Sequence, residues 1–175
     1  RAAAMRTVEE HQRAVAGLIR ARAAALVGLM QAQGLALAAD VTAPLSLPVF
    51  DNSGMDGYAV RAAELATAGA DNPVRLPVAE DIPAGRTDLL TLAPGTVHRI
   101  MTGAPVPAGA DAIVPVEQTD AGLPGATVEI RMAPKPGQHI RKAGEDVAAG
   151  ATVLRAGQVV TPAVLGLVAA LGLGE

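Results

Sequence analysis

The stretch that decides the fold is Phe50-Asp51-Asn52-Ser53-Gly54-Met55-Asp56-Gly57-Tyr58. It holds the only two aromatic residues of the 175-residue chain, with two carboxylates and two glycines between them. Aromatic side chains are bulky and directional, and tyrosine keeps a hydroxyl group for a polar partner. Placing both in one stretch is hard to explain as core packing, so we expect them to brace a loop that carries chemistry.

The composition of the chain limits the class of protein. Half of the residues are hydrophobic while Trp and Cys are absent, so we expect an aliphatic core without disulfides or thiolate metal sites. A net charge of −3 without a basic stripe gives nucleic-acid binding little support. No apolar run approaches the ~18 residues of a membrane span. The lack of cysteine suits a reducing compartment, and we predict a cytoplasmic protein.

Helical patterns are predicted at both ends of the chain. Thr7 and Glu10 form a capping box ahead of an apolar stripe. A second short helix is predicted over 27–33, followed by a strand over 35–41. Near the other end, strands over 152–154 and 158–160 predict a hairpin, and Thr161-Pro162 starts a helix that ends at Gly172.

The middle of the chain has a different texture, because prolines and glycines separate short apolar runs. Strands are predicted over 74–78, 96–101, 112–116 and 127–132. The predicted fold class is therefore mainly β with flanking helices. One economical arrangement packs the two ends together as a discontinuous domain of residues 1–46 plus 147–175, with 47–146 as an inserted β-rich domain.

Two segments of the middle region carry candidate chemistry, and each has a structural alternative. In the first, turn-forming residues around Asp56 can expose amides to an anion, while the carboxylate can hold a cation or take a proton. The alternative is that Asp51 and Asp56 only cap amides. In the second, Thr102 at a strand end offers a hydroxyl to a phosphate or a water molecule. The alternative there is simple strand termination.

A third segment, 139–146, groups opposite charges across a glycine. Arg141 and Lys142 can bind phosphate, and Glu145 and Asp146 can bind a divalent cation. The alternative is a solvated charged turn with local ion pairs. The three histidines lack the paired spacing of a metal site, and no serine lies in a nucleophile elbow, so a hydrolase triad is rejected.

Taken together and in this order, the segments resemble the molybdopterin molybdenumtransferase family, the MoeA and gephyrin E-domain proteins of molybdenum-cofactor biosynthesis. The matching stretches are Leu47–Arg61, Arg99–Pro107, Gly109–Val114 with Glu117, Ile140-Arg141 through Gly144-Glu145-Asp146, and Gly150. The resemblance covers essentially the whole chain. One variation is Gly54, at a position where Ala is more often expected in this family.

The resemblance implies a β-rich domain of coiled or bifurcated sheets inserted into an elongated α/β dimerisation domain. It implies an enzyme that inserts molybdate into adenylylated molybdopterin with release of AMP, assisted by Mg²⁺, and that works as a homodimer. The molybdopterin adenylyltransferase is an expected further partner. The family continues into an α/β domain with most of the molybdopterin and molybdate contacts and then a small β-barrel.

Neither of those later domains is present in the sequence, so we expect an N-terminal fragment that is inactive alone. The chain begins with Arg rather than Met, so we also expect that a segment upstream is missing. The alternative function is a non-catalytic dimerisation or scaffold module, as gephyrin-like relatives imply.

The resemblance also assigns roles to individual residues. Catalytic roles are implied for Asp56, Thr102 and Asp146, which match polar residues at the cleft of the family. Cofactor-binding roles are implied for Asn52, Ser53, Arg99, Gly103 and Arg141, and metal-binding roles for Asp56, Glu117, Glu145 and Asp146. Cleavage of a pyrophosphate bond depends on charge neutralisation and positioning more than on a strong nucleophile, which suits these residue types.

Overall fold

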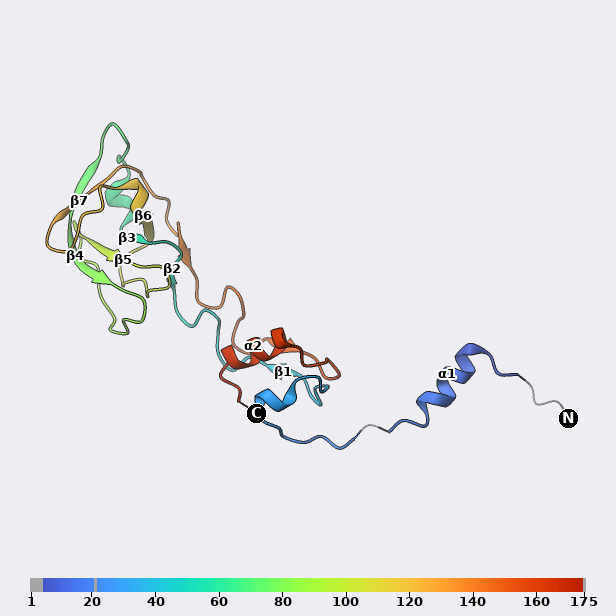
Figure 1. Cartoon of the computed structure of the whole chain (residues 1–175). Coiled ribbons are helices and arrows are strands. Elements are labelled where there is room, and N and C mark those ends of the chain that lie inside the picture. The colour runs from blue at the N-terminus through green and yellow to red at the C-terminus, as the bar shows by residue number, and fades with distance from the viewer. Residues whose placement is uncertain (1–4, 21, 175) are drawn as a thin grey trace. The chain divides into compact units, whose positions relative to one another are not determined.

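The computed structural model describes residues 5–20 and 22–174 (Figure 1). Contacts divide the chain into two compact units. One, which we call the terminal unit, comprises residues 1–39 and 156–175, and the other, which we call the β body, comprises residues 40–155. The domain boundaries predicted from the sequence, at 46/47 and 146/147, stay a prediction. No described helix is long and apolar enough to span a membrane.

The terminal unit contains α1 (Val8–Ala16), the short 3₁₀ helix η1 (Leu29–Ala32) and α2 (Pro162–Ala170). The predicted capping box is confirmed, because the Glu10 amide donates to the Thr7 hydroxyl and the Thr7 amide donates to the Glu10 carboxylate. The helix predicted over 27–33 is present only as the single turn of η1.

The start of α2 follows the sequence signal. The Thr161 hydroxyl accepts a hydrogen bond from the Val164 amide at 3.3 Å, and Pro162 occupies the first helical position. Gly172 adopts a φ of 75° just after the helix, which is the left-handed stop expected of glycine. Local signals therefore predicted this helix correctly.

Two strand predictions near the ends are wrong, one in the extent of the strand and the other in its pairing partner. Residues 35–41 do not form a continuous strand, because only an isolated bridge joins Ala36 to Val159. The hairpin predicted between 152–154 and 158–160 is also absent. Instead, β9 (Thr152–Leu154) pairs antiparallel with β1 (Val41–Thr42). The strand that pairs with β9 lies more than a hundred residues away along the chain. Turn signals between neighbouring segments cannot predict such a pairing.

The β body is built on a five-stranded sheet in the order β6-β3-β5-β4-β7, with a small two-stranded pairing of β2 and β8 (Figure 1). Neighbouring strands of the larger sheet are antiparallel except β4 and β5, which are parallel. The strands are β2 (Asn52–Ser53), β3 (Gly57–Val60), β4 (Val74–Ile82), β5 (Val97–Ile100), β6 (Ala112–Pro115), β7 (Thr127–Ile130) and β8 (Ile140–Arg141). A 3₁₀ turn, η2 (Ala62–Leu65), follows β3.

These strands confirm most of the sequence prediction for the middle region. The strands predicted over 96–101, 112–116 and 127–132 are each present, one or two residues shorter at an end. The strand predicted over 74–78 extends to Ile82. The chain is mostly β with few helices, as its fold class was predicted.

Apolar side chains cover both faces of the inner strand β3. Tyr58 and Val60 belong to one buried cluster, and Ala59 belongs to another with Ile100 and Ile113. Successive side chains of a strand point to opposite faces, so the sheet is buried on two sides. A strand of this kind is apolar throughout instead of alternating.

The two aromatic residues have different environments. Tyr58 is completely buried in the larger cluster, and its hydroxyl donates to the Gly122 carbonyl at 2.6 Å. The expectation that neither aromatic packs in the core is therefore wrong for Tyr58, which ties β3 to residue 122. Phe50 remains 48% exposed. The rare aromatic residues therefore mark one core position and one surface position.

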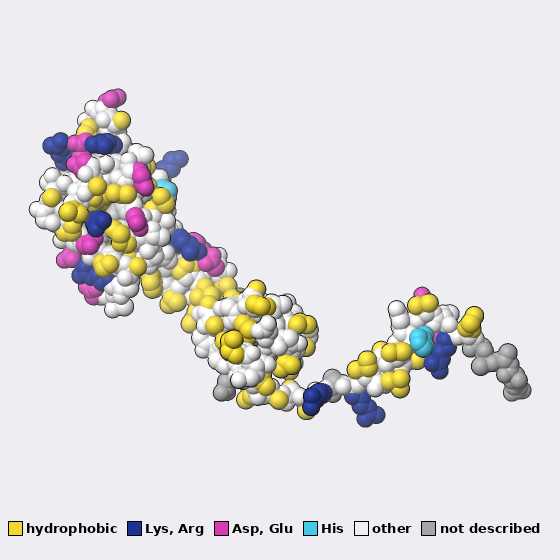
Figure 2. All heavy atoms as spheres, in the orientation of Figure 1, with side chains coloured by type: hydrophobic (Ala, Val, Ile, Leu, Met, Phe, Trp, Pro, Cys, Tyr) yellow, Lys and Arg dark blue, Asp and Glu magenta, His cyan; other side chains and the backbone are white. Residues whose placement is uncertain are grey.

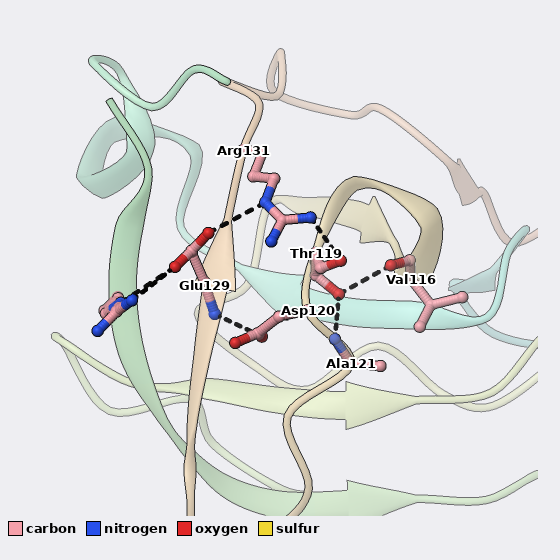
Figure 3. A network of polar contacts seen from close by, with 7 residues as sticks. Val116, Thr119, Asp120, Ala121, Glu129 and Arg131 are labelled. Carbon is pink, nitrogen blue, oxygen red and sulfur yellow. Dashed lines mark hydrogen bonds and ion pairs between the residues drawn. The ribbon is translucent and has the colours of Figure 1, made fainter. Parts of the chain in front are cut away.

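The loop after β6 is held by a polar network (Figure 3). It begins with η3 (Val116–Gln118), and the Thr119 hydroxyl donates to the Val116 carbonyl and accepts from the Ala121 amide. Arg131 donates to the Thr119 carbonyl and to the carboxylate of Glu129 on β7. These contacts fix residues 116–121 against β7 and cover that edge of the sheet.

Candidate functional site

The pairing of β3 with β5 places Asp56 beside Thr102. Gly57 at the start of β3 lies opposite Ile100 at the end of β5, because the two strands are antiparallel. The residues flanking this pair therefore meet at one end of the sheet. There the Asp56 Oδ1 atom accepts two hydrogen bonds of 2.7 Å, from the Thr102 amide and from the Thr102 hydroxyl.

These two hydrogen bonds also stabilise the ionised form of Asp56. They lower the pKa of the Asp56 carboxyl, the hydroxyl contact contributing most, then the amide, with a smaller effect of the positive charge on Arg99. Asp56 is exposed and ionised at neutral pH. Among the described residues, only its Oδ1 atom receives hydrogen bonds, so Oδ2 keeps its capacity to bind a ligand. Asp56 thus caps the Thr102 amide, as the structural alternative proposed. Its ionised carboxylate still has one oxygen that can bind a ligand.

A second group of contacts brings the third predicted segment to the first. β2 and β8 pair so that Asn52 lies opposite Arg141. The Gly54 amide donates to the His139 carbonyl at 2.8 Å, and the Ser53 amide donates to the Ala104 carbonyl at 3.0 Å. All three segments that the sequence singled out therefore meet through their backbones.

Arg141 organises the charges of the third segment. Its Nε atom lies 2.8 Å from Glu145 Oε1, and its Nη2 atom lies 2.7 Å from Asp146 Oδ2. These contacts raise the pKa of Arg141, and the Arg141 contact is the main reason that the pKa of Glu145 is lowered. The guanidinium is therefore neutralised by two carboxylates within its own turn.

Asp51 and Lys142 form a further contact between segments that no predicted role anticipated. The Asp51 Oδ2 atom lies 2.7 Å from the Lys142 Nζ atom, and Oδ1 accepts the Ala143 amide at 2.8 Å. The Lys142 hydrogen bond is the largest cause of a lowered pKa at Asp51. No sequence signal could have found this pair, because it depends on the register of β2 and β8.

The remaining predicted residues lie around these groups without joining them. Asn52 and Ser53 are buried, and their side chains hydrogen-bond to the backbone of their own loop. Gly103 has a φ of 80° and donates its amide to the Ser53 carbonyl. Arg99 lies 3.4 Å from Asp81, and Glu117 is exposed on η3. Their predicted roles in binding stay predictions.

Comparison with known proteins identifies the family. The family described as "MoeA N-terminal region (domain I and II)" matches residues 6–172. The chain belongs to this family. A solved structure, the molybdopterin biosynthesis MoeA protein of Pyrococcus horikoshii, matches the MoeA N-terminal fold of this chain with a TM-score of 0.79 at 34% identity. That match covers 85% of this chain and 38% of the other.

Curated relatives of this MoeA N-terminal region carry matching names. A protein of Mycobacterium tuberculosis named molybdopterin molybdenumtransferase 2 is 68% identical over 98% of this chain. A protein of Synechococcus elongatus named molybdopterin molybdenumtransferase is 43% identical over 85% of it. The chain spans 42% of the first relative and 37% of the second.

The carboxylates of this MoeA N-terminal region do not by themselves form a closed metal site. No group of three or more His, Cys, Asp or Glu side chains within residues 5–20 and 22–174 is arranged to hold a metal ion. Glu145 and Asp146 are occupied by Arg141, while Asp56 binds Thr102. These residues do not fit a complete Mg²⁺ site, so no step proposed below is routed through a metal.

Proposed function

We propose that the chain forms one wall of a molybdopterin molybdenumtransferase site, in which molybdate is inserted into adenylylated molybdopterin and AMP is released. The names of the curated relatives support the reaction. The observation that carries the proposal is the Asp56–Thr102 pair, which places an ionised carboxylate and a hydroxyl at one strand end, beside the convergence of the three segments.

The chemistry that these residues offer is orientation and charge balance. Thr102 donates its hydroxyl hydrogen to Asp56, so the hydroxyl oxygen keeps lone pairs that can accept from a water molecule or a protonated ligand atom. Asp56 stays ionised, and its free oxygen can orient that same group. Cleavage of a pyrophosphate bond uses positioning and electrostatic stabilisation, which an exposed, fixed carboxylate and hydroxyl can supply.

The charges of the third segment set a condition on phosphate binding. Arg141 already faces Glu145 and Asp146, so a phosphate that binds it has to exchange for one of these carboxylates. Arginine commonly binds carboxylates and phosphates through two parallel hydrogen bonds. We therefore propose that Asp146 acts by holding Arg141 in place as well as by facing substrate.

The matching region is a minor part of its relatives, and we propose that the chain needs the remainder for turnover. The test is a chimera in which residues 6–172 replace the matching part of the 68% identical relative from Mycobacterium tuberculosis. AMP and molybdenum cofactor formed from adenylylated molybdopterin and molybdate are measured for the chimera and for the chain alone. The expected result is an active chimera and an inactive chain. A folded but inactive chimera contradicts the proposed reaction, and turnover by the chain alone contradicts the need for a second wall.

A second proposal is that the terminal unit is a dimerisation module. Large apolar side chains are exposed on it (Figure 2), and α1 has no buried residue. These residues are Met5, Val8, Val15, Leu18, Ile19, Leu26, Met30, Leu35 and Val159. So much exposed apolar surface on one unit is typical of an interface. A second copy of this chain is the proposed partner, and contact with a molybdopterin adenylyltransferase stays a further prediction.

A further inference from the structure

Asp51 connects two of the three site segments although no predicted role includes it. Its carboxylate contacts Lys142 and the Ala143 amide, which lie 91 and 92 residues away along the chain. Asp51 therefore caps an amide, as the structural alternative held, and also forms an ion pair between the two segments. Asp51 immediately precedes β2, so the contacts attach the turn after β8 to the strand that β8 pairs with.

The turn attached in this way carries the charged residues of the candidate site. The Lys142 amide donates to Glu145 Oε2 at 2.9 Å, and the other oxygen of Glu145 receives Arg141. Arg141 in turn contacts Asp146. One continuous set of contacts therefore runs from Asp51 through Lys142 and Glu145 to Arg141 and Asp146.

The backbone pairing beneath this turn is short. β2 and β8 share two residue pairs, Asn52 with Arg141 and Ser53 with Ile140. Outside this ladder, the Gly144 amide donates to the Pro48 carbonyl and the Asp146 amide to the Leu47 carbonyl. Two-residue ladders specify their register weakly, and a slip by one residue turns every side chain to the opposite face. Contacts outside the ladder therefore help to hold its register, and the side chain of Asp51 adds two of them.

We propose that Asp51 is a positioning residue for the proposed reaction: through Lys142 and Ala143 it holds the segment with Arg141 and Asp146 against the loop that carries Asp56. The inference rests on the proposed function. The side chains of Lys142 and Asp51 are 61% and 41% exposed, so their ion pair contributes little to overall stability. Its effect is on geometry, which predicts a loss of activity without a comparable loss of folding.

A first experiment measures geometry in the full chain without substrate. Amide hydrogen exchange is followed by NMR in the wild type, Asp51→Ala, Asp51→Asn and Lys142→Met. Asp51→Ala removes the acceptor of the Ala143 amide, so exchange at Ala143 is expected to accelerate about tenfold, while amides of β3 and β5 keep their protection. Asp51→Asn keeps an acceptor and is expected to give a smaller change. Unchanged exchange at Ala143 in Asp51→Ala overturns the inference.

A second experiment measures catalysis in the chimera, with Arg75→Gln as the matched control. Arg75 forms a 2.8 Å ion pair with Glu129 between β4 and β7, so its variant loses a comparable surface pair in the same unit. Asp51→Ala is expected to lower kcat/KM about tenfold to a hundredfold, because a displaced group costs about this much. Asp51→Asn should fall between Asp51→Ala and the wild type, and all melting temperatures should agree.

The outcomes separate the two proposals. An active chimera in which Asp51→Ala and Arg75→Gln have equal kcat/KM contradicts the positioning role alone. A folded but inactive wild-type chimera contradicts the proposed function and the role of Asp51 with it. A loss of kcat/KM that follows the fraction of unfolded protein also contradicts positioning, since it shows a general effect on stability.

Discussion

The terminal unit and the β body differ in how far their apolar side chains are exposed to solvent. Of the thirteen large apolar side chains that are exposed among the described residues, nine lie in the terminal unit. Among its described apolar residues the same unit buries Val160, Leu165 and Leu171, whereas the β body has buried clusters on both faces of its sheet. The β body has its own core and carries the candidate site, while the terminal unit presents surface that a partner can cover.

The largest expected difference comes from truncating one apolar side chain in each unit. Tyr58→Ala in the β body removes a completely buried aromatic ring and should cost about 3–5 kcal/mol of unfolding free energy. Leu18→Ala in the terminal unit removes a side chain that is 84% exposed and should cost less than about 0.5 kcal/mol in the monomer. Urea unfolding of both variants is followed by far-ultraviolet circular dichroism. Tyrosine fluorescence is unsuitable, because Tyr58 is the only tyrosine of the chain and one variant removes it. Equal costs contradict the distinction between the units.

Replacing glycine by alanine should change stability in opposite directions in the two units. At Gly57 in β3 an added Cβ atom would lie 2.0 Å from the Val114 carbonyl oxygen, so Gly57→Ala should destabilise by about 1–3 kcal/mol or more. At Gly166 in α2 nothing lies within 4 Å of an added Cβ atom, so Gly166→Ala should stabilise by about 0.5–1 kcal/mol through helix propensity. Thermal unfolding of both variants tests the pair. Destabilisation by both would show that α2 is also closely packed at that position.

A pH-dependent effect between pH 7.5 and pH 5 is expected from His98 in the β body. Burial lowers the pKa of His98, while the charge of Glu80 opposes this effect and that of Arg86 adds to it. The Nδ1 atom of His98 has no hydrogen-bond partner among the residues that the structure describes. Because the folded-state pKa is below the unfolded value of about 6.5, the unfolded chain binds the extra proton first. Stability from neutral His98 is thus complete above that value and is lost as the pH falls towards the folded pKa.

His98→Leu should remove this part of the acid dependence. Unfolding free energies of the wild type and the variant are compared from pH 7.5 to pH 5, and their difference is expected to change in favour of the variant as the pH falls. His11→Leu on exposed α1 is the matched control in the terminal unit. A difference that does not vary with pH contradicts the assignment to His98.

The smallest effect on folding should accompany a change in assembly. Ile19→Asp places a charge on an exposed apolar position of the terminal unit and should alter the stability of the monomer by less than about 0.5 kcal/mol. Sedimentation velocity should show a dimer for the wild type and a shift towards monomer for the variant. Asp71→Asn, an exposed change in the β body, should leave the dimer intact. A wild-type monomer at high concentration contradicts the dimerisation proposal.

Sequence reasoning succeeded where the signal is local. Thr7 with Glu10, and Thr161 with Pro162, specify helix starts within one turn of chain, and both starts are present. It failed where the partner is distant, as for the strand predicted over 35–41 and the hairpin after Leu154. Proline and glycine residues between short apolar runs located the strands of the middle region.

The candidate site shows the same difference between local signals, which the sequence reveals, and distant contacts, which it does not. The residue types Asp56, Thr102 and Asp146 could be selected from the sequence, through the resemblance of their segments to a family. The contact between Asp56 and Thr102 follows only from the register that sets Gly57 opposite Ile100. The Asp51–Lys142 pair depends on the register of a two-residue ladder and has no signal in the sequence.

The most direct test of the proposed function is the rate of molybdenum-cofactor formation by the chimera carrying Asp56→Asn. Asparagine keeps an oxygen that can accept both hydrogen bonds from Thr102, so the loop is preserved while the negative charge is lost. The predicted result is a fall in turnover of about a hundredfold or more, with the melting temperature and the oligomeric state of the wild type. Turnover equal to that of the Asp71→Asn chimera would contradict the claim that Asp56 takes part in the reaction.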